Sequence, residues 1–594
     1  LWLPGASALW VPWCAGLTAA ALAAVPEKKA LATVCLLLAA LGPLALPTQS
    51  SSLRLSPHKP LAKALDAQGS RLLVDLYSPV GRLTVTRNDL APYRQAAGLS
   101  LAYQGSVNAQ WALFTDGEGF HPLPATRATG EKSDFSHLDF LPEALAYALG
   151  SRPRVLVVGP PVLVPLERAL QKRSAQVDLV VSNPGWRTLM ADPDMVGSMA
   201  QLRSSRVGLT IGAPRGYLRR GGLSYDLIVI GPPAPSAFRA AYSHTVEAYT
   251  QALDRLAPGG LLSLSGPSDL PPRSGLRLFT TAISALAARG VETPANHLIF
   301  IRSLRTVHIL VSSTPFSPAS SKTVRAFCRA RRFDPVWFPG MLPTEANRWN
   351  RLAAPQYYSS AISLLGPEDA HFRARYKFNL TPTRDDRPYF GSFLKPATVK
   401  ELFSLKGTGG LGMLTLAEPV LAATLIQAVA FSLLFIWLPL RRFRATRPAR
   451  DAQKPVPKGW LFLLLGAGFM LAEFAVLEKM RLFLNAPVLA AGVTLGSFLA
   501  LAGLGGGLSV RFLKSGHPPL GLCARFCLAA LGVLLLYRVA LPGVLTALLN
   551  FALPLRLAMA PLIIAPLAMT MGLPFPLAIA ALQDGQAKAI PWAW

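Results

Sequence analysis

The segment RVLVVGPP, residues 154–161, predicts a buried parallel β-strand that ends at Val158 and a turn that follows it. Three further apolar runs have the same character and are separated by helical stretches: Val177–Val181, Tyr225–Ile230 and Leu261–Leu264. Strands that alternate with helices are typical of a doubly wound α/β sheet. Ligands of such sheets bind outside the carboxyl ends of the strands. We therefore expect an α/β domain whose ligand site, if any, lies at the residues that follow these strands.

The residues at those strand ends lack the groups that bind a nucleotide. They are Gly159-Pro160-Pro161, Ser182-Asn183 and Gly231-Pro232-Pro233. A nucleotide site needs backbone N–H donors and a carboxylate for a ribose hydroxyl, and proline has no N–H. The sequence thus predicts a nucleotide-binding scaffold without its binding residues.

The composition indicates a membrane protein. The chain has 594 residues, only 15% of them charged, and its mean hydropathy of +0.36 is too high for an ordinary soluble protein. Its long apolar runs are Leu1–Val25, Ala30–Leu46, Leu414–Leu440, Trp460–Leu477, Pro487–Val510 and Leu520–Leu582. Because one crossing takes about 20 residues, we expect a polytopic α-helical protein with about seven crossings. The chain opens on Leu1 rather than Met, so we expect natural sequence to precede it.

Basic loops predict the orientation in the membrane. Lys28-Lys29 lies between the first two spans, the Arg-rich segment Arg441–Lys458 lies between the third and fourth, and Arg511 and Lys514 follow the fifth. The positive-inside rule assigns these loops to the cytoplasm. The soluble domain would then be periplasmic or extracytoplasmic, on a multi-pass protein of the bacterial inner membrane.

The expected domains follow from these patterns. They are two transmembrane helices over 1–48, a linker and small antiparallel β unit over 49–150, the α/β domain over 151–315, a helical and loop extension with a hinge over 316–410, and about five transmembrane helices over 411–594. Within the β unit the expected strands are 71–77, 81–87 and 111–116, and a hairpin over 297–312 closes the α/β domain.

Residues 49–410 have an excess of 17 positive charges over negative ones. Such an excess favours anionic surfaces. Nucleic acid is not expected on the outer face of a membrane, so we expect anionic lipid or an acidic subunit of a membrane complex as the partner. A merely solvated basic surface is the alternative.

Several motifs are shared with one known family. In the soluble part they are YSPVGRLTV (Tyr77–Val85), LFTDGEG (Leu113–Gly119), YDLIVI (Tyr225–Ile230), LAPGGLLSLS (Leu256–Ser265) and DDRPYF (Asp385–Phe390). In the membrane part they are GFMLAEFAVLEKMRLFL (Gly468–Leu484), MGLPFPL (Met571–Leu577) and IPWAW (Ile590–Trp594). On these residues the chain resembles the membrane-bound spermidine synthase-like family. The resemblance implies an aminopropyltransferase-like domain with a methyltransferase-type Rossmann fold, and a C-terminus that continues beyond Trp594.

The resemblance also implies where a catalytic member keeps its chemistry. A Gly-rich loop, an acid for the ribose, an acid for the adenine and an Asp that activates the attacking amine follow the first four strands. In this chain those positions hold Gly159-Pro160-Pro161, Ser182, Gly212-Ala213 and Gly231. Only Gly159 keeps the family's residue type, and base catalysis is worth about 10²–10⁴-fold. We therefore expect a degenerate pseudoenzyme with no cofactor and no catalytic residue.

Acidic residues outside the strand ends are the other candidates. Asp385 and Asp386 resemble a catalytic pair, but a turn whose carboxylates cap N–H groups and pair with Arg384 or Arg387 is the favoured interpretation. Glu473 and Glu478 lie in or at the end of a span, where acids often have a function. Glu478 could pair with Lys479 or Arg481, and Glu473 could relay protons or bond to Arg525.

The remaining patterns predict structure rather than chemistry. Gly503 and Gly505–Gly507 lie inside a span and predict close helix packing. Pro554, Pro561, Pro566, Pro574 and Pro576 predict broken or kinked helices. The histidines and five cysteines show no metal-ligand spacing, so no metal site is expected, and His308 is expected in the core.

The sequence thus favours a non-catalytic, accessory or structural subunit of a bacterial membrane complex. Two alternatives stay open: an active S-adenosyl-dependent aminopropyl- or methyltransferase with a rebuilt site, and a transporter with a proton-linked Glu473.

Overall fold

The computed structural model describes residues 33, 34, 37, 55–78, 80–125, 135–159, 163–195, 197, 199–233, 241–398, 417–439, 459–549 and 551–583. The first two expected spans, apart from three residues, lie outside these ranges, as does the motif Ile590–Trp594. The chain divides into two compact units. The first contains residues 1–96, 104–139 and 159–211, and the second contains 97–103, 140–158 and 212–594.

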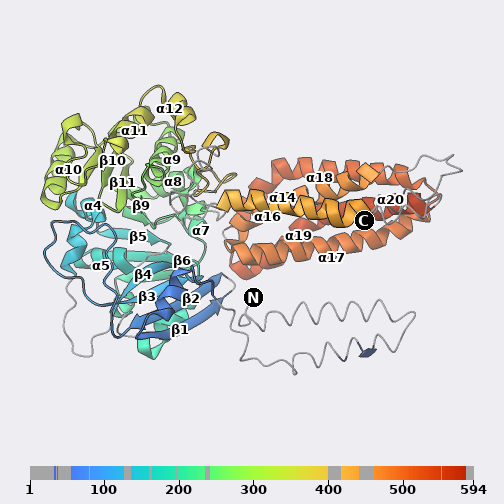
Figure 1. Cartoon of the computed structure of the whole chain (residues 1–594), viewed down its shortest axis with the longest axis horizontal. Coiled ribbons are helices and arrows are strands. Elements are labelled where there is room, and N and C mark those ends of the chain that lie inside the picture. Colours follow the sequence, from blue (N-terminus) through green and yellow to red (C-terminus); the bar gives the residue numbers. More distant parts are fainter. Residues whose placement is uncertain are drawn as a thin grey trace. The chain divides into compact units, whose positions relative to one another are not determined.

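The first unit contains the small antiparallel sheet that the sequence predicted (Figure 1). Its strands are β1 (Ser70–Ser78), β2 (Gly81–Asn88), β3 (Gln110–Thr115) and β4 (Glu118–Pro124), paired in that order. The same unit contains α3 (Pro60–Asp66), α5 (Leu163–Gln171), α6 (Gly185–Ala191) and the parallel pair β6 (Gln176–Val181) and β7 (Val207–Ile211). Ser78 pairs with Gly81, so the β1–β2 turn is tight.

The α/β sheet has eight strands in the order β12-β10-β11-β9-β8-β5-β6-β7. In the second unit these are β5 (Arg154–Val158), β8 (Tyr225–Ile230), β9 (Leu256–Pro267), β10 (Leu298–Arg302), β11 (Thr306–Ser312) and β12 (Asp334–Trp337). β5, β8 and β9 run parallel, whereas β9, β11, β10 and β12 pair antiparallel. The interior residues of β5 are at most 1% exposed, as expected of a strand covered on both faces.

Helices of the second unit flank these strands in the chain. They are α4 (Leu145–Ala148), α7 (Pro214–Arg219), α8 (Val246–Leu253), α9 (Ser274–Ala288), α10 (Pro318–Arg331), α11 (Gln356–Leu365) and α12 (Asp369–Arg375). The expected α/β domain with a small antiparallel β unit is therefore confirmed, and its sheet is mixed. The expected closing hairpin is β10–β11.

Five helices of the described residues are long and apolar enough to cross a membrane. These spans are Pro419–Trp437, Gly459–Leu484 (α16), Pro487–Leu513 (α17), Pro519–Leu548 (α18) and Leu553–Leu582. The first span comprises most of α14 (Ala417–Ser432) and a π-helical turn, and the last comprises α19 (Leu553–Gly572) and most of α20 (Pro574–Gln583). Pro561 and Pro566 lie within α19, and the helix is interrupted before Pro574, as the prolines predicted.

Candidate functional site

Gly159, the first expected site residue, directly follows β5 and has φ +73°. Glycine adopts this left-handed conformation without steric cost. Its N–H donates to the carbonyl oxygen of Val180 at 3.1 Å. This backbone donor is therefore used in pairing strands. Pro160 and Pro161 lie outside the described residues.

The end of β6 is occupied by the β1–β2 turn. Asn183, which is 7% exposed, donates from Nδ2 to the carbonyl oxygen of Gly81 at 3.0 Å. Its Oδ1 accepts from Ser78 Oγ at 3.0 Å and from the N–H of Gly185 at 2.8 Å. Sequence reasoning had singled out Ser182 at this strand end, but its neighbour Asn183 forms these contacts. The amide fastens the hairpin turn to the start of α6.

The ends of β7 and β8 lead into structural contacts. Gly212 follows β7 and leads through Ala213 into α7. The N–H of Gly231, after β8, donates to the carbonyl oxygen of Val158 at 3.1 Å. Nearby in the second unit, burial lowers the pKa of His244 to about 4, although a hydrogen bond that the imidazole donates to the backbone of Gly231 acts to raise it. His244 Nδ1 lies 2.9 Å from Tyr249 Oη, so this imidazole is a neutral core group at neutral pH.

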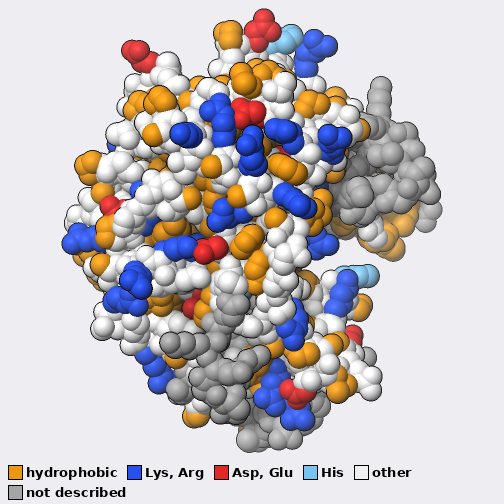
Figure 2. Space-filling view, turned by 90° about the vertical axis from the view of Figure 1, so that its left-hand side faces the viewer, with side chains coloured by type: hydrophobic (Ala, Val, Ile, Leu, Met, Phe, Trp, Pro, Cys, Tyr) orange, Lys and Arg blue, Asp and Glu red, His pale blue; other side chains and the backbone are white. Residues whose placement is uncertain are grey.

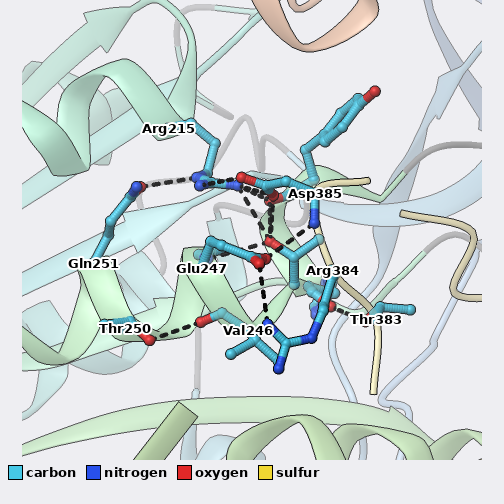
Figure 3. A network of polar contacts seen from close by, with 12 residues as sticks. Arg215, Val246, Glu247, Thr250, Gln251, Thr383, Arg384 and Asp385 are labelled. Carbon is cyan, nitrogen blue, oxygen red and sulfur yellow. Dashed lines mark hydrogen bonds and ion pairs between the residues drawn. The ribbon is translucent and has the colours of Figure 1, made fainter. Parts of the chain in front are cut away.

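Arg215 and Asp385 form the centre of a polar network in the second unit (Figure 3). Arg215 donates from Nη1 to Asp385 Oδ1 at 2.6 Å and from Nη2 to Oδ2 at 2.9 Å. The arginine side chain is 5% exposed and the aspartate side chain 25%. Thr245 Oγ1 donates to the same carboxylate at 2.7 Å, and Gln251 Oε1 accepts from Arg215 Nε at 2.9 Å. Such a bidentate pair is strong and directional, so Asp385 neutralises a buried cation.

The expected pairing of Asp385 with Arg384 or Arg387 is wrong. Arg384 instead lies 3.7 Å from Glu247, toward which Figure 3 shows its side chain extending. Glu247 Oε2 also accepts from the N–H of Asp385 at 3.0 Å. The expected turn is present, because the N–H of Arg387 donates to the carbonyl oxygen of Arg384 at 2.9 Å. Arg384 is thus paired with Glu247, and the Asp385 carboxylate binds Arg215.

The rest of the DDRPYF motif is bound to the helices of the α/β domain. The carbonyl oxygen of Pro388 accepts from the N–H of Ala241 at 2.8 Å, and that of Thr383 accepts from Val246 at 2.9 Å. Arg277 of α9 donates to the carbonyl oxygen of Phe390 at 2.6 Å. These bonds fix the segment that leads toward the membrane helices.

Two tyrosines near this network contact the end of α16. Tyr242 Oη donates to the carbonyl oxygen of Glu478 at 3.0 Å, and Arg481 Nη1 lies 3.5 Å from Tyr389 Oη. Glu478 and Arg481 pair at 2.7 Å, so Arg481 is the partner among the two expected from the sequence. Burial, with a contribution from Glu478, raises the pKa of Tyr389 to about 12. We call these four residues the α16 junction.

Helix α7 also approaches the membrane helices. A Cβ atom added at Gly216 would lie 3.1 Å from the carbonyl oxygen of Leu549, just after α18. Glycine is therefore the residue that permits this approach. Arg215 precedes Gly216 on α7. The Arg215–Asp385 pair therefore joins α7 to the loop of Asp385 and Tyr389, which reaches α16.

Glu473 lies inside the helix bundle and is 6% exposed. Across the described part of the chain, its carboxylate has no hydrogen bond or ion pair. The expected partner Arg525 is exposed on α18, and its guanidinium does not pair with Glu473. An intramembrane acid without a partner is the strongest functional candidate of the bundle.

The glycine-rich segment of α17 packs closely on α19, as predicted. A Cβ atom at Gly505 would collide with the carbonyl oxygen of Met569, and one at Gly572 would collide with that of Ala502. The segment is therefore a helix-packing surface rather than a phosphate loop.

A small cavity of about 50 Å³ lies in the first unit beside α5. Its lining includes Leu123, His137, Leu163 and Glu167. Glu167 is 7% exposed, and its Oε1 has no hydrogen-bond partner among the described residues. Burial raises the pKa of this carboxyl to about 8. Among all the described residues, that cavity included, no group of three His, Cys, Asp or Glu side chains could hold a metal ion.

Comparisons with known proteins support only a distant likeness. No protein-family model matches the chain, and no curated protein matches it. The chain is similar to the crystal structure of spermidine synthase from Thermotoga maritima, at 16% identity and a TM-score of 0.29, over 43% of this chain and 78% of the other. A spermidine synthase in complex with the transition state analogue AdoDATO is 16% identical, with a TM-score of 0.30, over 43% of this chain and 79% of the other. A probable spermidine synthase from Corynebacterium glutamicum is 15% identical, with a TM-score of 0.28, over 44% of this chain and 86% of the other.

Proposed function

We propose that this chain is a non-catalytic, spermidine synthase-like subunit that plays an accessory or structural role in a bacterial membrane complex. The observation that carries the proposal is how the polar groups near the strand ends are used. Gly159 and Gly231 bond to other strands, Asn183 holds a hairpin turn, and Asp385 neutralises Arg215. The acids that aminopropyl transfer needs are replaced by Ser182, Gly212 and Gly231.

The α16 junction supports an extracytoplasmic soluble domain. The Glu478 end of α16 contacts Tyr242, whereas its other end, Gly459, directly follows the basic segment Arg441–Lys458. The positive-inside rule puts that segment in the cytoplasm. A domain on the opposite side would be separated from the cytoplasmic pool of S-adenosyl compounds.

Ligand binding is the first test. The purified full chain in detergent should give no binding heat with S-adenosylmethionine or its decarboxylated form, while an active spermidine synthase under the same conditions serves as the positive control. Micromolar affinity, about −8 kcal/mol, would overturn the proposal in favour of a rebuilt transferase.

Association is the second test. Extraction from native membranes in mild detergent should give a particle much heavier than 63.5 kDa plus detergent, and high salt should remove part of the partner by screening charge. A monomer at low salt would contradict an accessory role.

A transporter is the second candidate function, because the Glu473 carboxyl is buried in the bundle and has no partner among the described residues. Proton-linked uptake into proteoliposomes that is lost in Glu473→Gln, but retained in Glu478→Gln, would support it. No uptake by either variant or the parent would exclude it for the substrates tried.

A further inference from the structure

We propose that a rigid surface centred on Trp349 docks an acidic, aromatic-containing segment of a partner protein. This Trp349 surface consists of Leu304, Arg305, Arg332, Arg348, Trp349 and Arg351. The inference rests on the proposed function, because it supplies the face through which an accessory subunit would bind. It adds the location and chemistry of that face.

A buried carboxylate organises the surface. Asp334, which is 1% exposed, accepts hydrogen bonds from three consecutive backbone N–H groups: those of Arg348 at 2.7 Å, Trp349 at 2.8 Å and Asn350 at 2.7 Å. Arg302 donates to the same carboxylate at 3.0 Å and to the carbonyl oxygen of Asn350 at 2.5 Å. A buried ion pair therefore holds the loop backbone.

Side-chain bonds close the loop at its ends. Asn347 donates from Nδ2 to the carbonyl oxygen of Leu352 at 2.9 Å, and its Oδ1 accepts from the Leu352 N–H at 2.7 Å. Asn350 Nδ2 donates to the carbonyl oxygen of Arg332 at 3.2 Å. The loop is thus ordered before any partner arrives, which lowers the entropy cost of binding through it.

The side chains that this backbone presents are apolar and basic. Trp349 is 40% exposed and Leu304 is 56% exposed, so both side chains have apolar area that a partner can bury. The four arginines are exposed, and no ion pair or side-chain hydrogen bond engages their guanidinium groups within the described residues. The three segments that form the surface, 302–305, 332–334 and 347–352, contain a single acid, Asp334, which is already bound to Arg302.

An acidic protein fits this surface better than a lipid membrane does. Trp and Arg are the residues that most often dominate binding at protein interfaces, when an apolar anchor is surrounded by polar contacts. Strand β12, which carries Asp334, is separated from β8 by three strands, or roughly 19 Å at the usual strand spacing. The α16 junction involves Tyr242, close after β8, so the Trp349 surface is not part of that contact. Figure 2 shows a face on which Lys and Arg clearly outnumber Asp and Glu, so the general charge also favours an acidic partner.

Two fluorescent polymers test the proposal on the full chain in detergent: poly-glutamate, and a copolymer of glutamate and tyrosine. Reversal of two charges in Arg348→Glu/Arg351→Glu should weaken the binding of the copolymer by about tenfold. Arg154→Glu/Arg187→Glu makes the same charge change at exposed sites elsewhere and should have a clearly smaller effect. Trp349→Ala should weaken the binding of the copolymer severalfold and leave the binding of poly-glutamate unchanged, because only the copolymer contains aromatic rings.

Equal losses in the two double variants would overturn the proposal, because binding would then follow net charge alone. Equal behaviour of both polymers toward Trp349→Ala would also overturn it. A third contrary result would be that Arg348→Glu/Arg351→Glu abolishes the binding of short-chain phosphatidylglycerol and leaves the binding of the copolymer unchanged. The surface would then be a lipid site, and the proposal would be wrong. A complex that survives extraction in the surface variants would leave the accessory role intact while refuting this docking face, so the two proposals fail separately.

Discussion

Arg215 and Asp385 form a two-point ion pair although 170 positions separate them in the chain. The pair joins α7, which follows the third parallel strand of the chain, to the loop that reaches the end of α16. In a catalytic domain an aspartate beside the strand ends could accept a proton, but here its two oxygens are bound to a guanidinium and a threonine. The network of Figure 3 therefore has a structural role that can be measured.

Removal of the carboxylate in Asp385→Ala should lower the free energy of unfolding by about 3 kcal/mol, because it leaves the buried cation of Arg215 unpaired. The neighbouring Asp386 is exposed, so Asp386→Ala should change it by no more than about 0.5 kcal/mol. Denaturant unfolding of the two variants in the same detergent compares them. Similar losses in both would show that the pair contributes little.

The α16 junction should depend on Arg481 more than on the nearby Lys479. Arg481→Met removes the partner of Glu478 and the contact with Tyr389, so backbone amides of residues 384–390 should exchange faster with solvent. Lys479→Met removes one positive charge two residues earlier in α16 and leaves the contact between Arg481 and Tyr389 in place. Hydrogen exchange read by mass spectrometry distinguishes the two variants, and equal exchange in both would show that Arg481 does not hold the α16 junction together.

The stability of the first unit should depend on pH through Glu167. Burial raises its pKa from 4.5 to about 8 in the folded protein. The folded state therefore holds this proton more tightly, so the stabilisation is complete below pH 4.5 and is lost as pH rises through about 8. Glu167→Gln keeps a neutral side chain and should remove this loss, while Glu118→Gln, at an exposed acid of β4, should not. Unfolding measured across that range checks the slope, and parallel curves for all three proteins would contradict it.

The orientation can be read by labelling single cysteines in a cysteine-free background. Ala319 is the exposed second residue of α10. Ala319→Cys should react with a membrane-impermeant maleimide in intact spheroplasts. Ala449→Cys, in the basic segment, should react only after lysis. The reverse pattern would place the soluble domain in the cytoplasm and remove the compartment argument against catalysis.

The strands with strong apolar character were predictable, and the contacts between distant segments were not. β5 and β8 coincide with the expected ranges because Val, Leu and Ile fill strands covered on both faces. β7 was located only through the resemblance, by Gly212-Ala213 after it, because its sequence VGLTI is half-buried at the sheet edge and contains glycine. β4 was missed because it contains two prolines, and β12 because it contains a proline and has only four residues.

The same difference applies to the candidate site. Asn183 was visible beside Ser182, but its contact with the β1–β2 turn depends on a pairing of segments about 100 residues apart. Arg215 had no local signal at all, because a single arginine after a proline is common on surfaces. The helix-packing role of Gly505 was predictable, since small residues in a span have few other uses.

The contact between α17 and α19 restricts how the bundle can move. At Gly505 and Gly572 each helix approaches the backbone of the other so closely that no side chain fits between them. Sliding along the axis would bring Leu504 or Met571 into that gap, and rotation would do the same. We therefore expect the two helices to travel together as one rigid body, so that any opening of the bundle takes place at other helix contacts, such as those of α16 and α18 with this pair.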